Sequence, residues 1–356
     1  MSESLDKLIN SIKPVNFELK EKIEHRLNNL TKPKGSLGRL EEFACRYCCI
    51  TNTYMPPKLK KVVLVFAGDH GITEEGVSAF PKDVTFQMVK NFLEGGAGIN
   101  VLARHVNADV KVIDIGVDYD FKDMPGLIHK KVAFGTKNMA KGPAMTRQEA
   151  IEAILNGAEV AEETINNGAN ILATGEMGIG NTTPSSALTA AICQRTPEEV
   201  TGKGTGIDEK AYKHKINLIK KALEINAPNL ADPIDCLSKV GGFEIGGICG
   251  MILKACQMKI PVVVDGFISG AGAIVAKALN PNVSEYLFAG HSSVEKGHKV
   301  QMDYLGLKPI LDLNMRLGEG TGAVLAIGLI EAGLKIYSEM ATFDGANVSP
   351  GNEAEI

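Results

Sequence analysis

The chain has 356 residues, of which 44% are hydrophobic and 22% are charged, and its formal net charge is −4. This weakly negative balance excludes a general nucleic-acid binder, because phosphate backbones require a concentrated basic surface. The length and composition are typical of a soluble globular protein with one large domain or with a main domain and a smaller appendage.

Membrane and metal partners are not expected from the sequence. No apolar run reaches the roughly 20 residues that are needed to span a bilayer. Residues 1–13 mix Ser, Glu, Asp and Lys and lack the apolar core of a secretory signal, which favours a cytoplasmic protein. The segment Cys45-Arg-Tyr-Cys48-Cys49 resembles half of a metal site, but no second Cys-x-x-Cys motif or His pair completes it. We therefore expect buried thiols and no bound metal.

The predicted elements change in character along the chain. Residues 1–55 are predicted to be helical, with a break at Thr31–Ser36. From Lys61 onward, short apolar runs alternate with helical stretches. The apolar runs predict strands at 62–66, 110–115, 171–173, 262–264, 286–288 and 310–313. The periodic stretches between them predict helices at 84–103, 147–166, 209–225, 245–258 and 322–337.

Continuous apolar strands that alternate with helices are typical of a parallel sheet covered on both faces. The predicted fold class is therefore α/β, with a doubly wound, mostly parallel, Rossmann-like sheet and a smaller helical domain formed by the chain ends. In this division residues 1–55 form the helical part of the small domain, and residues 56–325 form the α/β nucleotide-binding catalytic domain. Residues 326–356 form a C-terminal helix that returns to the small domain.

Most of the predicted strands lead directly into a Gly-rich or polar cluster. These clusters are Val65–Gly71, Ala173–Pro184, Asp265–Ser269, Ala289–Lys296 and Met315–Gly320. The carboxyl ends of parallel strands line one edge of an open sheet, and ligands bind at that edge. The clusters therefore predict one convergent active site.

The second cluster has the features of a phosphate-binding turn. Gly178 and Gly180 allow a close approach of the backbone to a ligand, and Asn181 and Thr182 suit the start of a helix, whose N-terminus favours an anion. A Walker A loop is excluded because no Gly-Lys-Ser/Thr follows, and Gly-x-Gly alone is too weak to indicate a dinucleotide. We predict a mononucleotide phosphate here, and the alternative is an ordinary tight turn between strand and helix. Further phosphate candidates are Lys215 and the glycine-rich segment Thr201–Gly206.

Two glutamates, Glu176 and Glu319, lie in turns flanked by glycine. Such a carboxylate can abstract a proton if burial raises its pKa toward neutrality, whereas the alternative is a solvated loop charge. A carboxylate pair also occurs in glycoside hydrolases, but the phosphate-like turn favours a nucleotide substrate. Asp69 and His70 follow the first strand, and we interpret them as hydrogen-bonding residues because adjacent residues rarely chelate one metal ion.

Several segments match a single family, in the same order along nearly the whole chain. They are Lys32–Leu40, Phe66–Gly71, Glu75–Thr85, Gly175–Pro184, Ser238–Phe243, Asp265–Phe267, Ser293–Gly297 and Met315–Gly322. In these segments the chain resembles the nicotinate-nucleotide:dimethylbenzimidazole phosphoribosyltransferases. The resemblance implies transfer of ribose 5-phosphate from nicotinate mononucleotide to an aromatic base that becomes the lower ligand of a cobamide. The implied products are an α-ribotide and nicotinate, and neither a cofactor nor a metal is expected.

The same resemblance assigns roles to individual residues. Glu319 is the implied base that removes the proton of the acceptor, and Glu176 is an implied supporting carboxylate. The residues implied to bind the nucleotide and its phosphate are Gly178, Asn181, Thr182, Gly204, Lys215, Asp265, Ser293 and Leu317. The residues implied to line the acceptor base are Phe80, Pro81, Met88 and Met177. The family also implies a dimer, either a homodimer or a heterodimer with a paralogous subunit.

One departure from the family pattern concerns the acceptor. Some members that use dimethylbenzimidazole carry a Ser, a Gln and a Leu where Phe80, Met88 and Met177 stand here. An apolar pocket that Met can reshape accepts a flat phenol as well as an azole. The expected acceptor is 5,6-dimethylbenzimidazole or a related azole, and the alternative is phenol or p-cresol, used by relatives that pair with a paralogous subunit.

Two other classes of protein are alternatives to this enzyme. A non-catalytic nucleotide-binding paralogue would lack Glu319, Glu176 or the phosphate turn, and all of these are present. A nucleotide-binding oxidoreductase would need Gly-x-Gly-x-x-Gly at the start of a helix and an acidic residue about 20 positions later. That context is missing from the sequence.

Overall fold

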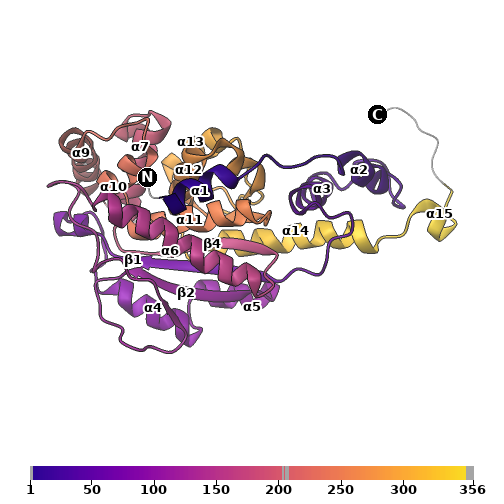
Figure 1. The fold of residues 1–356 in the computed structure, drawn as a ribbon, viewed down its shortest axis with the longest axis horizontal. Coiled ribbons are helices and arrows are strands. Elements are labelled where there is room, and N and C mark those ends of the chain that lie inside the picture. Colours follow the sequence, from indigo (N-terminus) through magenta and orange to yellow (C-terminus); the bar gives the residue numbers. More distant parts are fainter. Residues whose placement is uncertain (1–2, 203, 205–207, 350–356) are drawn as a thin grey trace.

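A six-stranded parallel sheet with the order β3-β2-β1-β4-β5-β6 is the framework of the computed structural model, which describes residues 3–202, 204 and 208–349 (Figure 1). The strands are β1 (Lys61–Gly68), β2 (Asp109–Gly116), β3 (Leu127–His129), β4 (Ile171–Met177), β5 (Val262–Val264) and β6 (Leu287–Ala289). The chain adds strands outward from β1 to β3, returns to the centre, and adds strands outward from β4 to β6. This is the doubly wound topology predicted from the sequence.

Helices cover both faces of the sheet, which explains why the central strands are continuously apolar. All eight residues of β1 are buried. One face is covered by α4 (Val84–Glu94), α5 (Gly98–Val106) and α14 (Thr321–Glu339). The other face is covered by α6 (Arg147–Asn166), α11 (Phe243–Gln257) and α12 (Phe267–Leu279), and Figure 1 shows α6 and α11 on the opposite side of the strands from α4 and α5.

Glycines bring α11 into backbone contact with its neighbours. A Cβ at Gly250 would overlap the carbonyl group of Ile154 in α6, and a Cβ at Gly247 would lie 2.7 Å from the ring of Phe66 in β1. Protein interiors are packed as densely as organic crystals, so no space remains there for added atoms. The start of α11 is therefore held firmly against the sheet edge at which the polar clusters gather.

Further helices pack around α12, either directly or through α7. They are α7 (Thr182–Cys193), α8 (Pro197–Val200), α9 (Glu209–Asn226), α10 (Pro233–Val240), η2 (Pro281–Tyr286) and α13 (Lys296–Leu305), while the short η1 (Gly71–Glu75) directly follows the cluster after β1. Asp208 caps α9 by accepting a hydrogen bond of 2.8 Å from the N–H of Ala211, which fixes the first described turn of that helix.

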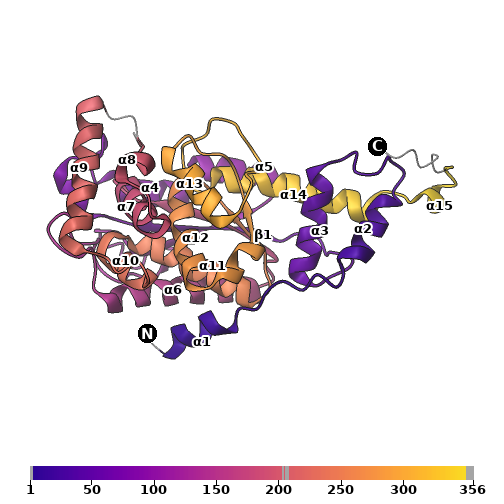
Figure 2. The same ribbon diagram turned by 90° about the horizontal axis from the view of Figure 1, so that it is seen from above.

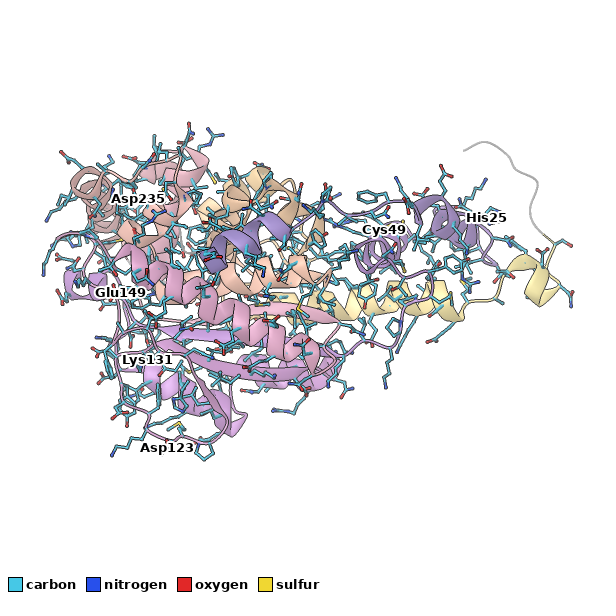
Figure 3. All side chains as sticks on the ribbon, viewed as in Figure 1. His25, Cys49, Asp123, Lys131, Glu149 and Asp235 are labelled. Carbon is cyan, nitrogen blue, oxygen red and sulfur yellow. The ribbon has the colours of Figure 1, made fainter. Side chains whose placement is uncertain are left out.

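The two ends of the chain meet at the far end of α14, where this helix leaves the sheet (Figures 1 and 2). There α14 packs against α3 (Arg39–Thr51), beside α2 (Lys20–Asn28) and α15 (Phe343–Ala346). The N–H of Thr31 donates 3.0 Å to the carbonyl of Ala341, and this bond joins the two ends directly. By contrast, α1 (Glu3–Ser11) packs on α11, away from this helical end (Figure 2). Cys49 of α3 is buried in the helical end (Figure 3).

Five of the six predicted strands are confirmed, and the sixth is wrong. Residues 310–313 form only a single bridge, between Leu311 and His291, and Leu313 is exposed. The run is apolar, but it lies beside the chain that leaves β6 and does not extend the sheet. The three-residue edge strand β3 was not predicted, because it is too short to show a period.

The helix predicted at 84–103 consists of two helices. Gly95 has φ +80° and ends α4 with a left-handed cap, so α5 begins separately at Gly98. The helices predicted at 147–166, 209–225, 245–258 and 322–337 are confirmed to within two residues at each end. Helices rich in Ala and other small residues were missed: the extent of α7 and the whole of α12 were not predicted, because most of their residues are buried and they have no polar face.

Among the described residues, α14 is the one helix that is long and apolar enough to cross a membrane, and 56% of its apolar window is buried inside the protein. It packs on β4, β5, α3 and α5. This burial accounts for its apolar composition as that of a core helix.

The contact between α6 and α11 predicts a stability effect. Gly250→Ala should lower the free energy of unfolding by about 1–3 kcal/mol, because the new methyl group forces the two helices apart. Urea unfolding followed by circular dichroism measures this loss. Gly328→Ala in α14 is the control, because its Cβ would meet Val106 at 3.4 Å. Alanine is the better helix former there, so equal losses in both variants would contradict the close-contact explanation.

Candidate active site

The ends of β1 and β4 form the crevice at which the strand order of the sheet reverses. The two strands pair side by side, with Phe66 opposite Glu176 and Ala67 opposite Met177, but the chain leaves them toward opposite edges. Ligands of open α/β sheets bind at such a point. Four of the five predicted polar clusters follow β1, β4, β5 and β6, and the fifth leads into α14 at the same edge.

Glu319 is presented by a turn in which three successive residues have a left-handed backbone. The φ angles are +85° at Gly318, +63° at Glu319 and +95° at Gly320. For a residue with a Cβ this conformation is unfavourable by about 1–2 kcal/mol, so Glu319 is strained. Its Oε2 accepts a hydrogen bond of 2.9 Å from the N–H of Ile99 in the first turn of α5. The carboxylate is thereby fixed between α5 and the end of β4.

Asp265, which follows β5, holds this turn in place. Its Oδ2 accepts 3.2 Å from the N–H of Gly320, and its Oδ1 accepts 2.8 Å from the N–H of Ala323, so it caps α14. Burial raises the pKa of Asp265, whereas His291 and the capping N–H groups act in the opposite direction. Both oxygens thus accept from backbone N–H groups and the side chain is 1% exposed, so the described contacts of Asp265 hold the turn, and its predicted nucleotide contact stays a prediction.

Glu176 lies directly beside the Glu319 turn. A Cβ at Gly318 would overlap its Oε1, and its Oε2 accepts a hydrogen bond from the side-chain amide of Asn181. The amide of Asn181 is directed at this carboxylate, and the nucleotide contact predicted for Asn181 stays a prediction. Burial, followed by the negative charges of Asp265 and Glu244, raises the pKa of Glu176 to about 8. Glu176 is therefore mostly protonated at pH 7.

The two glutamates predicted from the sequence are thus brought together in different electrostatic states. Burial also raises the pKa of Glu319, and Asp265 adds to this rise, but the N–H of Ile99 stabilises the charged form. Carboxyl groups whose surroundings separate their pKa values can divide acid and base roles between them.

Lys215 of α9 extends its ammonium group to the N-terminus of α7. Its Nζ donates 2.7 Å to Oγ1 of Thr182, and a Cβ at Gly204 would lie 3.5 Å from the same Nζ. Burial lowers the pKa of Lys215 to about 8, while the charge of Glu295 opposes this shift. A buried ammonium group beside a helix N-terminus is suited to an anion. The predicted residues Lys203, Thr205 and Gly206 lie outside the described part of the chain.

Gly178 and Ser293 border the crevice from two strands. A Cβ at Gly178 would overlap the carbonyl of Gly68, so the loop after β4 lies directly on the end of β1. The N–H of Ser293 donates 3.1 Å to Nδ1 of His298. Burial lowers the pKa of His298 to about 3, so its ring stays neutral and can accept this bond. The backbone after β6 is thereby fixed.

Two of the predicted acceptor residues, Met88 and Met177, belong to α4 and β4, which pack against each other on one side of the crevice. Oγ1 of Thr85 accepts 3.1 Å from the N–H of Ile179, which ties the first turn of α4 to the loop after β4. The apolar side chains at this side are all partly accessible, and they belong to Phe80, Pro81, Met88 and Met177. Leu317, predicted to contact the nucleotide, is 60% exposed in the Glu319 turn.

Sequence reasoning did not single out Glu244. This residue lies in the first turn of α11, is fully buried, and has its Oε1 2.8 Å from Nε2 of His70. The Gly-Gly pair before Phe243 and the His in the cluster after β1 were the available signals. Asp69 accepts 2.8 Å from the N–H of Asp118, in agreement with the hydrogen-bonding role predicted for it. Within the described ranges, no group of three or more His, Cys, Asp or Glu residues is arranged to hold a metal ion.

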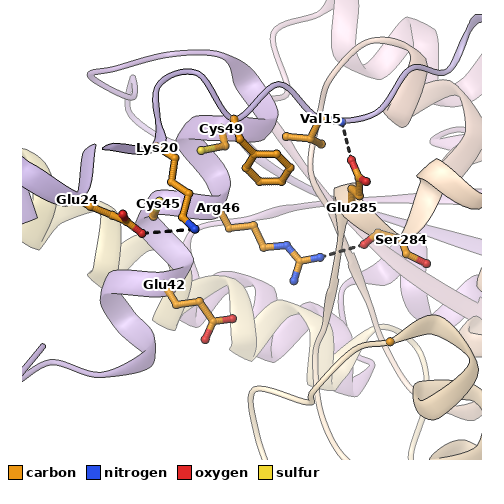
Figure 4. Close-up of a pocket in the computed structure, with 11 residues that line it drawn as sticks. Val15, Lys20, Glu24, Glu42, Cys45, Arg46, Cys49, Ser284 and Glu285 are labelled. Atoms are coloured by element: carbon orange, nitrogen blue, oxygen red, sulfur yellow. Dashed lines mark hydrogen bonds and ion pairs between the residues drawn. The ribbon is translucent and has the colours of Figure 1, made fainter. Parts of the chain in front are cut away.

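A separate pocket of about 500 Å³ lies between the helical end and the η2 turn (Figure 4). Arg46 crosses it and donates 2.9 Å to the carbonyl of Ser284. Its lining mixes both charge signs, and burial raises the pKa of the Cys45 thiol to about 12, so this thiol is not a reactive nucleophile. None of the predicted site residues line this pocket.

Comparisons with known proteins identify relatives along nearly the whole chain. A phosphoribosyltransferase family model matches residues 12–348. The chain is 58% identical over 347 residues to the nicotinate-nucleotide-dimethylbenzimidazole phosphoribosyltransferase of Geotalea uraniireducens, covering 98% of this chain and 99% of that protein. It is also 58% identical over 348 residues to the protein of the same name from Geobacter sulfurreducens. The crystal structure of such a phosphoribosyltransferase from Thermus thermophilus superposes with a TM-score of 0.89 at 45% identity, covering 94% of this chain and 100% of that one.

The buried ammonium group of Lys215 predicts pH-dependent anion binding. An anion binds the charged form, which is present below the pKa of about 8 and is lost as the pH rises through it. Sulfate affinity, measured by calorimetry, should therefore be constant near pH 7 and fall above pH 8. Lys215→Met should weaken sulfate binding at pH 7 by about tenfold or more and remove this dependence. Lys221→Met on the exposed side of α9 is the control and should bind sulfate as the wild-type protein does. Equal sulfate affinities of the wild-type protein below and above pH 8 would contradict the assignment of Lys215 as the anion-binding group.

Proposed function

This chain belongs to the nicotinate-nucleotide:dimethylbenzimidazole phosphoribosyltransferase family, and on that premise we propose that it transfers ribose 5-phosphate from nicotinate mononucleotide to an aromatic lower-ligand base. The observation that carries the proposal is the 58% identity over 98% of the chain. The candidate residues Glu319, Glu176 and Lys215 converge at one sheet edge, which supports the same reaction. The chain is accordingly an enzyme, a pentosyltransferase of cobamide nucleotide-loop assembly.

The transfer exchanges one glycosidic bond for another. The bond between C1′ of the ribose and the pyridinium nitrogen breaks, and its electron pair neutralises the departing nicotinate. A nitrogen of the acceptor forms the new bond to C1′ from the opposite face, which gives the α-ribotide. The acceptor then carries a surplus proton, which a base must remove. The leaving group is already activated by its charge, so the enzyme contributes positioning and proton removal.

We assign the base role to Glu319. Its carboxylate is held by the N–H of Ile99, and burial raises its pKa toward the range in which a base is effective. Glu176, with a pKa of about 8, is mostly protonated at pH 7 and does not compete for the proton. Its neutral carboxyl group can instead donate a hydrogen bond to the ribose or to the acceptor.

A cluster of buried carboxyl groups supports chemistry at a cationic centre. Glu176, Glu244, Asp265 and Glu319 gather at the ends of β1, β4 and β5. Positive charge lies on the pyridinium ring in the ground state and spreads onto C1′ as the glycosidic bond breaks. A carboxylate of this cluster in a water-poor site, such as that of Glu319, stabilises such a charge more strongly than water does, whereas the neutral carboxyl group of Glu176 contributes a dipole only. The 5′-phosphate is assigned to Lys215, Thr182 and Gly204 at the N-terminus of α7.

The acceptor is assigned to the apolar side of the crevice. Phe80, Pro81, Met88 and Met177 offer flat or adaptable surfaces and no side-chain N–H or O–H donors, so they suit an aromatic ring. Dimethylbenzimidazole, which the relatives carry in their names, is the first candidate. Phenol or p-cresol, joined through oxygen, remains the alternative within the same reaction. A non-catalytic paralogue is disfavoured by the presence of both glutamates and the phosphate-site lysine.

We also propose a dimer located in the cytoplasm, either a homodimer or a pair with a paralogue. Several large apolar side chains are exposed on loops around the sheet edge, namely Phe80, Phe134, Val294, Leu313 and Leu317. Such a set is characteristic of a surface that a partner covers. Light scattering that returns the mass of a single chain, 38.0 kDa, would exclude the homodimer, and cell fractionation tests the location.

Release of nicotinate is the direct test of the activity. The protein is incubated with nicotinate mononucleotide and, in turn, with dimethylbenzimidazole, benzimidazole, adenine, phenol and p-cresol, and the products are separated by chromatography. We expect nicotinate and an α-ribotide in equal amounts with at least one azole. Omission of the acceptor controls for simple hydrolysis. No nicotinate release with any acceptor would refute the enzyme assignment.

The assignment of the base predicts the behaviour of Glu319→Gln. The amide keeps an oxygen that accepts from Ile99, so the melting temperature should be unchanged, but proton removal is lost and kcat should fall by about 10²–10⁴-fold. The rate of nicotinate release measures the loss. Glu339→Gln at the exposed end of the same helix region should retain full activity. Undiminished turnover in Glu319→Gln would refute the base role while leaving the family membership intact.

A further inference from the structure

A buried hydrogen-bonded pair lies behind the site. Nε2 of His70, which follows β1, lies 2.8 Å from Oε1 of Glu244 in the first turn of α11, and the two side chains are 1% and 0% exposed. His70 has no role in the reaction as assigned above, and Glu244 enters it only as a member of the buried carboxyl cluster. The pair therefore joins two elements of the site without access to solvent.

Three backbone segments lie close against this pair, each at a glycine, and at Gly242 no side chain fits. A Cβ at Gly242 would overlap the ring of His70 and lie 2.6 Å from Oε2 of Glu244. A Cβ at Gly178 would lie 3.2 Å from Nε2 of His70, and one at Gly68 would lie 3.3 Å from Oε2 of Glu244. The pair thus fixes the end of β1, the loop after β4 and the start of α11 relative to one another.

The pair is only partly satisfied by hydrogen bonds. Nδ1 of His70 and Oε2 of Glu244 have no partner among the described residues. An unpaired buried polar atom is unfavourable by about 1–3 kcal/mol, and buried ion pairs often stabilise no more than apolar residues of the same shape. Stability alone therefore does not account for a histidine and a glutamate at this point.

Glu244 acts electrostatically on Glu176, which lies near the end of β4, two positions before Gly178. The pKa of Glu176 is raised by burial, then by Asp265, then by Glu244, while the amide of Asn181 and the N–H of Glu319 lower it. These are the charged and polar groups that face Glu176 from the neighbouring elements. Because no donor neutralises Oε2 of Glu244, its charge acts through a poorly screening interior.

We propose that His70 and Glu244 are a buried positioning pair for the transfer reaction: their hydrogen bond fixes the loop after β4, and the carboxylate of Glu244 acts electrostatically on Glu176 in that strand. This inference rests on the proposed function. It gives a role to a histidine that follows β1 and is 1% exposed. It also assigns the Gly-Gly-Phe-Glu segment at the start of α11 to the active site.

Two substitutions of Glu244 test the two effects separately, one for its charge and one for the position that its hydrogen bond fixes. Glu244→Gln keeps the shape and a hydrogen-bonding oxygen but removes the charge. The pKa of Glu176 should then fall, so the inflection that it gives in the pH profile of kcat should move to lower pH by about one unit. Glu244→Asp keeps the charge but shortens the reach to His70, so kcat should fall by about tenfold or more at every pH with the inflection in place.

The profiles are recorded from nicotinate release at saturating nicotinate mononucleotide, where Lys215 is already paired with phosphate and does not titrate. Glu152→Gln on the exposed face of α6 removes one charge away from the site and should reproduce the wild-type profile. Melting temperatures are measured for every variant. A downward shift in Glu244→Gln alone supports the proposal, because a purely structural residue changes the rate and not the inflection.

Three outcomes would overturn the inference. They are an unmoved or raised inflection in Glu244→Gln, no inflection in the wild-type protein between about pH 6 and 10, and loss of the folded state in both Glu244 variants, which would assign the pair to folding. Failure of the proposed function is distinguishable from all three, because the wild-type protein would then release no nicotinate at all.

Discussion

The carboxylate of Asp265 determines where the Glu319 turn can lie, and the geometry of the site depends on it. Its oxygens accept hydrogen bonds from Gly320 and Ala323, so the end of β5, the turn and the N-terminus of α14 form one unit. Charged acceptors at a helix N-terminus are favourable because they satisfy N–H groups that have no partner in the helix. This interaction offsets the strain of a glutamate at φ +63°. The carboxylate of Glu319, which is held in this turn and bonded to the N–H of Ile99, therefore cannot rotate to another hydrogen-bond partner.

The distribution of charge along the crevice orients the substrate. At the ends of β1, β4 and β5, burial raises the pKa values of Glu176, Glu319 and Asp265, and repulsion by Asp265 adds to the rise at Glu176 and Glu319. At the N-terminus of α7, by contrast, Lys215 and the helix dipole favour an anion. A nucleotide with a phosphate at one end and a cationic ring at the other matches this polarity in a single direction. The cost of burying like charges is then offset only when the cationic substrate is bound.

Sequence patterns predicted the frame of this site better than its supporting contacts. The alternation of apolar runs and helices predicted the sheet, and the glycine-flanked Glu176 and Glu319 were recognisable because turns after parallel strands share one edge. The role of Asp265 was not predictable, because its partners lie 55 and 58 positions away and only folding brings them together. Glu244 was missed for the same reason, since a glutamate in the first turn of an apolar helix gives no sign of facing a histidine 174 positions earlier. The false strand at 310–313 shows the opposite error, in which local composition is right for a strand but no neighbour pairs with it.

The contrast between the two sides of the crevice bears on the choice of acceptor. Glu319 is tethered through Ile99 and Asp265 and is nearly inaccessible, so the position of the proton-removing oxygen is set by the protein and not by the ring that binds. The proposed acceptor wall consists of Phe80, Met88 and Met177, which are exposed or partly exposed, and methionine adapts its shape at little energetic cost. With a rigid proposed base and an adaptable proposed wall, such a site requires only that an acceptor be flat and bring an acidic N–H or O–H to one point. Acceptor selectivity therefore depends on the shape of that wall, while the chemistry of proton removal stays the same for an azole and for a phenol.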